Sequence, residues 1–572
     1  MSDQRKRVLG AIGVFLVLLG IYLFTDPGRI DIVDGYWRYE VAKNWLDVGE
    51  PIVTNRNLFV TPGRMLNPVT GKSYSIYNAA PSITPMPLML LARLLPGRSP
   101  ERDCFAFSLV GPLFGALLGA LLVLGYGLLG IGLRESLLYT ALFCLATLWW
   151  PASVTVFDQN QHAALLFSAV LLAWLAGRRE SIRLAALAGL LGGLLINYQE
   201  MYALLLPAVG LAVFASPEEG SPADQAALQQ SPGRAALLRY STFGLCCCAG
   251  LALLLAYNEL RFGTPLMLAR YAAQQKHQPP TWGNPVTGFL GLTISPGKGI
   301  VWFSPPLILA LLGARRLWAR APALALTAAG VSGIYLLVII HLAFFGGDWC
   351  WGPRYVIPVM PLWALAFPFA TARLRQPLRV VAPLVAAGLL VQVAGVSIDS
   401  HRFFYEMKLP PFRWETDQWF YFKHSQLAAR PAEILASFRS GSPGEPDRFD
   451  ASPTGHLISR LYGIHNPALS RVWLGDNYQL YYLPRPWWGW IGWTPPRDRP
   501  CDPAWLMAWC TAFLALGSAL AARSLCASDR KSAVKGSRSD NVEPEPVSAP
   551  GAERGEMDLA VASPAFSGRD TK

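Results

Sequence analysis

The placement of arginine between long apolar runs is the feature that most limits how this chain folds. Apolar runs fill most of residues 8–400, and the short gaps between them alternate in kind. One set of gaps is short and rich in arginine, as at Arg178 and Arg315, while the other holds acidic, amide, histidine and aromatic residues, as at 34–50 and 158–162. Cytoplasmic loops of membrane proteins carry the Lys/Arg excess. The alternation therefore predicts a polytopic membrane protein with its chemically active groups on the outer face.

The composition agrees with this class. Charged residues make up 15% of the 572 residues and hydrophobic residues 52%, whereas a soluble domain carries about 25% charged residues. A net charge of +12 would suit nucleic acid in a soluble protein. Here much of the basic excess lies at the inner ends of the expected helices, and no basic patch with interleaved aromatic residues occurs. We therefore expect contacts with membrane lipids and none with nucleic acid.

The apolar runs predict the fold class. A transmembrane helix needs roughly 20 apolar residues, and fewer where part of it is buried in protein. We expect an all-α polytopic membrane protein with about 12 transmembrane helices, in the plasma (inner) membrane of a bacterium, with both termini cytoplasmic. The expected spans are residues 8–24, 105–129, 136–150, 163–176, 184–196, 201–215, 240–257, 303–313, 322–345, 355–370, 380–396 and 503–522.

Two assignments decide this topology. Residues 85–95 are apolar but short and contain Arg93, and counting them as a span would move Arg178 to the outer side. We interpret them as an interfacial or re-entrant helix. One long helix over residues 184–215 would bury the polar turn at 197–200. Two short helices joined by an outer turn are expected instead.

The chain is expected to divide into four parts. Residues 1–396 form the transmembrane domain, and residues 397–502 form an outer-face segment whose fold the sequence leaves open. Residues 503–522 form the last transmembrane helix. Residues 523–572 are rich in Ser, Pro, Gly and charge and hold few large apolar residues, which is typical of a disordered tail, here on the cytoplasmic side.

The first outer segment holds the main catalytic candidate. Residues 36–46 have the spacing of an amphipathic helix, and Asp34 stands just ahead of them. Two interpretations of Asp34 remain open. It is either a helix N-cap, whose carboxylate accepts backbone N–H bonds, or a carboxylate at the outer membrane surface that acts as a general base. Asp31, on the same segment, is a candidate to support or replace it.

Other polar residues on the expected outer side are weaker candidates. Asp158 and His162 flank a turn, where such residues bind a metal, bind a phosphate–metal pair, or simply form a solvated turn. Glu200 stands in the next outer turn. Arg354 and Lys298 stand in glycine-bearing loops at the outer ends of spans, where a cation either binds phosphate oxygens or extends to lipid headgroups.

Several of these stretches together resemble a known family. They are D-G-Y-W-R-Y-E-V-A-K-N-W-L-D-V-G-E-P after the first span, S-I-Y-N-A-A-P-S-I-T-P-M-P-L further along the same loop, and the later loops Y-N-E-L-R-F-G-T-P-L, S-P-G-K-G-I-V-W-F-S-P-P-L and G-G-D-W-C-W-G-P-R-Y. They are similar to the GT-C superfamily of polytopic glycosyltransferases, near its protein O-mannosyltransferase and lipid A aminoarabinose transferase branch. The resemblance covers roughly residues 8–400.

The resemblance implies an inverting glycosyltransferase that depends on a lipid-phosphate sugar. A polyprenyl-phosphate donor would give its sugar to a glycan, lipid or protein acceptor at the outer face, and the first-loop carboxylate, here Asp34, would deprotonate the acceptor hydroxyl. Many members carry a second acidic residue directly afterwards, whereas this chain has Gly35. Asp34 is then the lone base, with Asp158 as a helper, and Arg354 and Lys298 bind the donor phosphate. The resemblance assigns no certain cofactor, and a divalent metal is left open.

Two functions of other classes remain open. A transporter or flippase of a lipid-linked glycan often shows an internal repeat and polar residues at mid-span, and the sequence shows neither. A non-catalytic envelope assembly protein would use the outer segment to bind its partners. The sequence names neither the sugar nor the acceptor.

Overall fold

The computed structural model of the chain describes residues 2–55, 63–96, 99–216, 232–266, 282–347, 349–371, 376–406, 419–439, 484–489, 491 and 499–539. The chain divides into a unit of Met1–Ala527 and a second unit of Ser528–Lys572. The features discussed below belong to the first unit. The last helix, α28 (Pro503–Ser539), continues beyond residue 522, where the last span was expected to end. The rest of the expected tail, 540–572, lies outside the described residues.

Helices form nearly all of the described regular structure. The described strands are β1 (Arg64–Leu66) and β2 (Ser73–Ser75), which pair antiparallel. The predicted class, an all-α polytopic membrane protein, is confirmed. In the described part of the chain, seven helical stretches are long and apolar enough to cross a membrane: α1 (Asp3–Thr25), α5 with α6 (Pro100–Leu128), α9 (Gln159–Arg178), Gly233–Phe262 of α13 (Pro232–Phe262), α18 (Pro322–Ile340), α21 (Pro377–Ser397) and Pro503–Ala527 of α28.

The remaining expected spans are shorter or broken helices. Proline accounts for several breaks, as at Pro207 and Pro358, because it removes a backbone donor and clashes with the preceding helical turn. These elements are α7 (Leu133–Ala146), α8 (Trp149–Ser153), α10 (Ile182–Ile196), η2 (Glu200–Leu204), α11 (Leu206–Gly210), η3 (Leu211–Phe214), α16 (Ile300–Phe303), η4 (Pro305–Leu307), α17 (Ile308–Arg320), η5 (Arg354–Val359), α19 (Met360–Ala364) and α20 (Phe367–Thr371).

Glycine permits close helix contacts in the bundle. α10 and α13 meet where a Cβ added to Gly250 would lie 2.1 Å from the carbonyl oxygen of Gly193. α1 and α28 meet where a Cβ added to Gly13 would lie 2.8 Å from the backbone nitrogen of Ala521. Small residues at helix crossings let backbones approach closely in a membrane, where van der Waals packing drives helix association. These glycines therefore set the spacing of both helix pairs.

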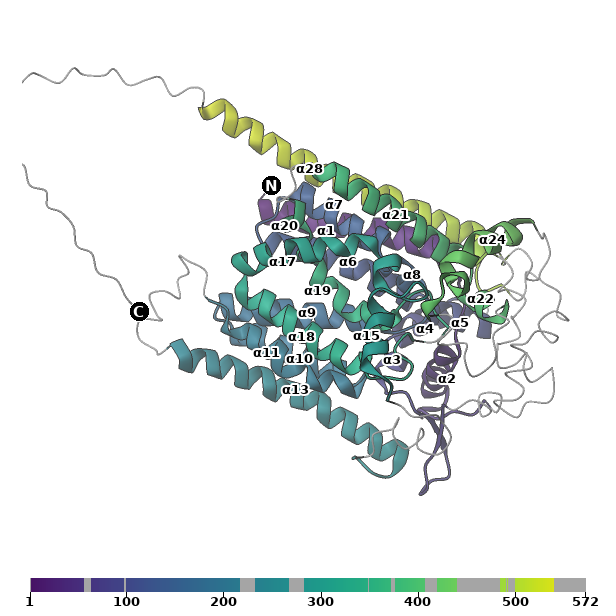
Figure 1. Ribbon diagram of the computed structural model, residues 1–572. Coiled ribbons are helices and arrows are strands. Elements are labelled where there is room, and N and C mark those ends of the chain that lie inside the picture. The colour runs from purple at the N-terminus through teal and green to yellow at the C-terminus, as the bar shows by residue number, and fades with distance from the viewer. Residues whose placement is uncertain are drawn as a thin grey trace, which may run out of the picture. The chain divides into compact units, whose positions relative to one another are not determined.

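The segments expected on the outer side gather at one end of the bundle. Figure 1 shows α2 (Val33–Val48) and α4 (Met86–Arg93) there, together with α22 (Ser400–Glu406) and α24 (Gln426–Arg439), while α1 begins at the other end. α4 has 8 residues, too few to cross a bilayer. It thus matches the short, non-spanning helix expected at residues 85–95. This end of the bundle carries the candidate site.

Candidate functional site

The first turn of α2 presents Asp34. The helix begins at Val33, and its N-cap is Ile32, which makes no side-chain capping bond. Asp34 is therefore the second helical residue, and the N-cap interpretation is wrong. Its Oδ1 accepts a hydrogen bond from Tyr77 Oη at 2.6 Å, and its side chain is 25% exposed.

Arg354 lies beside Asp34. Its Nη1 is 3.7 Å from Asp34 Oδ2, and its guanidinium carbon lies 4.0 Å from the ring centre of Phe157. Only 8% of the side chain is exposed, so Arg354 does not extend to the lipid headgroups. Gly347 makes room for it, with a φ of 79° and a position where an added Cβ would lie 2.4 Å from Arg354 Cγ. The glycine-bearing loop thus positions the guanidinium group.

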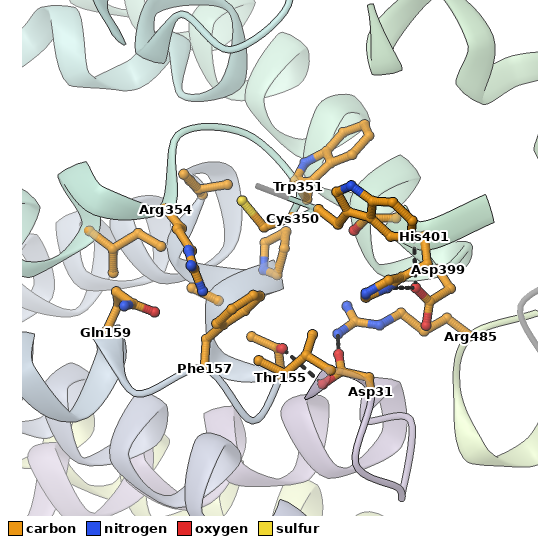
Figure 2. Close-up of a pocket in the computed structure, with 17 residues that line it drawn as sticks. Asp31, Thr155, Phe157, Gln159, Cys350, Trp351, Arg354, Asp399, His401 and Arg485 are labelled. Atoms are coloured by element: carbon orange, nitrogen blue, oxygen red, sulfur yellow. Dashed lines mark hydrogen bonds and ion pairs between the residues drawn. The ribbon is translucent and has the colours of Figure 1, made fainter. Parts of the chain in front are cut away.

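A pocket adjoins the guanidinium group of Arg354 (Figure 2). Its space is about 450 Å³, counting the open mouth. Figure 2 shows Arg354 and Phe157 on one side, and Asp399, His401 and Arg485 on the other. Arg354 therefore contacts Asp34 and also lines the pocket. The arrangement combines a partly exposed carboxylate with a wall that carries cationic groups.

Asp31 lines the same pocket but is heavily hydrogen-bonded. Its Oδ2 lies 2.7 Å from Arg485 Nη2, and both side chains are 5% exposed. Its Oδ1 accepts bonds from Thr155 Oγ1 at 3.1 Å and from the backbone nitrogen of Val156 at 3.3 Å. These contacts hold the Asp31 carboxylate in place between Arg485 and the backbone of Val156. Asp31 joins the loop after α1 to the loop before α9.

Asp158 and His162 form a buried charged cluster rather than a solvated turn. Asp158 Oδ2 lies 3.0 Å from Arg38 Nη2 and 3.4 Å from His162 Nε2. His162 Nδ1 lies 2.9 Å from Tyr202 Oη. Burial alone would raise the pKa of Asp158, but the charges of Arg38 and His162 outweigh it and hold that pKa well below its usual range. This cluster ties α2 to α9 and η2.

Lys298 and Glu200 occupy other positions. Lys298 is 1% exposed, and its Nζ donates to the carbonyl oxygens of Cys350 at 2.6 Å and Gly352 at 3.1 Å. The ammonium group thus anchors the loop before Arg354, and its role as a ligand of the donor phosphate stays a prediction. Glu200 begins η2, and its supporting role stays a prediction.

Asp399, His401 and Arg485 also line the pocket and were not among the candidates. Asp399 and His401 directly follow α21, and Arg485 belongs to the outer segment whose fold the sequence left open. Asp399 Oδ1 lies 2.7 Å from His401 Nδ1, and its Oδ2 lies 3.3 Å from Arg29 Nη2. Burial raises the pKa of Asp399, but His401 and Arg29 outweigh it and hold the pKa well below its usual range. The Asp-x-His spacing just after a span was the sequence signal that could have pointed to this pair.

The site offers carboxylates, guanidinium groups and an imidazole. These groups suit proton transfer and the binding of an anion. Among the described residues, no group of three or more His, Cys, Asp or Glu side chains is placed to hold a metal ion.

Comparison with known proteins gives similarity at the level of the fold. No family model matches the chain, and no curated protein matches it. ArnT from Cupriavidus metallidurans in the apo state is similar, with a TM-score of 0.43 and 14% identity, over 91% of this chain and 78% of that one. ArnT from the same organism bound to undecaprenyl phosphate has a TM-score of 0.40 and 13% identity, and the match covers 94% of this chain and 80% of that one. Neither likeness decides what this chain does.

Proposed function

We propose that this chain is a membrane glycosyltransferase that moves a sugar from a polyprenyl-phosphate donor to an acceptor hydroxyl at the outer face of the membrane. The contact between Asp34 and Arg354, at 3.7 Å, carries this proposal. It joins a partly exposed carboxylate to a guanidinium group that also lines a pocket. A base and a stabiliser of the leaving phosphate are the two groups that such a transfer needs.

The proposed step uses both groups in one displacement. Asp34 accepts the proton of the acceptor hydroxyl, whose oxygen then forms a bond to the anomeric carbon of the sugar. The bond from that carbon to the phosphate oxygen breaks, and its electron pair leaves with the polyprenyl phosphate. Arg354 stabilises the charge that develops on the phosphate. Attack opposite the leaving group inverts the configuration at the anomeric carbon.

The position of α2 suits a lipid-borne donor. α1 ends at Thr25 and α2 begins at Val33, so Asp34 follows the outer end of the first span closely. A polyprenyl chain holds its phosphate near the headgroup level of the membrane. The proposed orientation has both termini in the cytoplasm, as the distribution of arginine predicts.

The direct test is transfer by purified protein from radiolabelled polyprenyl-phosphate hexose, pentose and aminosugar donors to an extracted envelope acceptor. Asp34→Asn keeps the shape and removes the base, and we expect a loss of about a hundredfold. Glu50→Gln is the matched control, because Glu50 is an exposed carboxylate on the same outer segment, paired with Lys72 at 2.6 Å. Transfer by Asp34→Asn at the wild-type rate, with the control unchanged, would refute the assignment of Asp34.

A further inference from the structure

Gln159 brings an amide side chain to the wall of the pocket. It is the first residue of α9, and it lines the pocket on the same side as Arg354 and Phe157 (Figure 2). The residue is 6% exposed. Its Oε1 is buried and has no hydrogen-bond partner among the residues that the structure describes. A nearly buried hydrogen-bond acceptor at the pocket wall therefore lacks a donor.

A buried acceptor without a donor is unfavourable. Burial removes the water that would otherwise donate to the amide oxygen, and most buried polar side-chain atoms in folded proteins have a partner. Other polar groups of the same pocket follow this rule, since Thr155 Oγ1 donates to Asp31, which also accepts from Arg485 Nη2. The oxygen of Gln159 departs from it. At the wall of a pocket, a bound ligand is the natural source of the missing donor.

The neighbours of Gln159 indicate which part of a ligand would reach it. Phe157 stands two residues earlier, and its ring centre lies 4.0 Å from the guanidinium carbon of Arg354. In the proposed function, Arg354 stabilises the phosphate of the donor. The sugar of the donor is joined to that phosphate through a single oxygen atom. A phosphate held at Arg354 would therefore bring the sugar into the space that Gln159 lines.

The chemistry of the amide oxygen favours the sugar over the phosphate. An amide oxygen accepts hydrogen bonds and donates none. An ionised phosphodiester also offers acceptor oxygens alone, so the two would repel each other. The hydroxyl and amino groups of a sugar carry the hydrogens that this oxygen needs. An amide rotated by half a turn would instead present its nitrogen to the phosphate, and the test below separates the two arrangements.

We propose that Gln159 is a specificity-determining residue that accepts a hydrogen bond from a hydroxyl or amino group of the donor sugar. The proposal rests on the proposed function, since it takes the donor phosphate to lie at Arg354. It adds a contact that recognises the sugar itself. A site that pairs a buried polar group with a substrate hydroxyl discriminates against a substrate that lacks the hydroxyl, because the buried group is then left unpaired.

The test measures binding of four polyprenyl phosphodiesters to the purified full-length protein. Three carry a hexose, a pentose or an aminosugar, and the fourth is the methyl ester, which has the phosphate and no sugar. We expect the wild type to bind at least one sugar donor about tenfold more tightly than the methyl ester, as one hydrogen bond allows. Gln159→Met keeps the length of the side chain and removes the amide. It should weaken binding of that donor about tenfold and leave binding of the methyl ester unchanged.

A second measurement identifies the group on the sugar. Forms of the best-bound donor that each lack one hydroxyl or amino group are compared with the parent. In the wild type, one form should bind about tenfold more weakly than the parent. In Gln159→Met, the same form and the parent should bind alike, because the contact is already lost. The wild-type series needs no variant, so it tests the sugar contact even where a variant fails to fold.

Gln199→Met is the matched control. Gln199 precedes η2 and makes no side-chain capping bond, and it stands apart from the described lining of the pocket. Its replacement should leave the affinities for all four phosphodiesters as in the wild type. Thermal unfolding of both variants checks that they are folded.

The inference is overturned if Gln159→Met binds the sugar donors as the wild type does. It is also overturned if the variant weakens binding of the methyl ester and the sugar donors equally, which would place the amide on the phosphate. Wild-type protein that binds no sugar donor more tightly than the methyl ester, or a series in which no single group matters, would reject it as well. The proposed function is tested separately by sugar transfer. Selective binding that depends on Gln159, without transfer, would reject the transferase and keep the sugar contact.

Discussion

Replacing Arg38 by methionine tests the buried ion pair that supports the site. Arg38 Nη2 and Asp158 Oδ2 are 3.0 Å apart, and the two side chains are 4% and 6% exposed. The guanidinium carbon of Arg38 also lies 4.8 Å from the ring centre of Tyr77, whose hydroxyl donates to Asp34. The pair thus links the N-terminal end of α9 to the helix that carries the proposed base.

The expected loss of stability follows from the charge of Asp158, which stays buried when Arg38 is removed. Removing one partner of a buried ion pair costs about 3–5 kcal/mol, because the other charge stays buried without compensation. His162 Nε2 remains 3.4 Å from Asp158, and Arg354 also lowers the pKa of this carboxyl. We therefore expect Arg38→Met to cost about 3 kcal/mol, at the lower end of that range.

The assay is thermal unfolding in detergent, followed by tryptophan fluorescence, across a double-mutant cycle. Arg38→Met and Asp158→Leu should each lower the midpoint, and the double variant should recover most of the loss because it buries no unpaired charge. The folded-state pKa of Asp158 is depressed. Its stabilisation is therefore present above its unfolded pKa of about 4 and is lost as the pH falls through the folded value.

The same cycle separates structure from catalysis. An Arg38→Met protein as stable as the wild type at neutral pH would refute the reasoning. A double variant that is stable and transfers sugar would confine Asp158 to a structural role. A double variant that is stable but inactive would support the helper role expected from the sequence.

Three further predictions concern other parts of the chain. Lys298→Met should lower the free energy of unfolding by about 2–3 kcal/mol, measured by thermal unfolding, because it leaves the carbonyl oxygens of Cys350 and Gly352 without their donor. Unchanged stability together with a loss of phosphate binding would instead support Lys298 as a ligand of the donor phosphate. Gly250→Ala should destabilise by about 1–3 kcal/mol through overpacking against Gly193, whereas Gly244→Ala, where an added Cβ meets nothing within 4 Å, should not; equal effects would contradict the packing argument. Reporter fusions after Arg179 and Arg316 should report the cytoplasmic side and a fusion at Gly347 the outer side, and an outer signal at Arg316 would break the proposed topology.

The outer segment beyond residue 397 illustrates what the sequence left undetermined. Asp399 and His401 stand two residues apart just after a span, yet nothing local indicates that their neighbours are Arg29, from the loop after the first span, and Trp349, from a distant loop. For Lys298, in contrast, the local sequence suggested a role, and the fold gave the side chain other partners. Its glycine-bearing loop suggested a phosphate ligand, but the chain folds Cys350 and Gly352 over its ammonium group.

The sequence by itself determined the membrane class, most of the long helices, and the helix that carries Asp34. These depend on local properties, namely apolar length, helical periodicity and the position of arginine relative to the spans. The contact of Asp34 with Arg354, the burial of Asp31 and Asp158, and the pair at His401 were decided only by the tertiary structure. Each depends on which distant backbones pack together, because a buried charge takes the partner that packing brings within a few ångströms and not its neighbour in sequence.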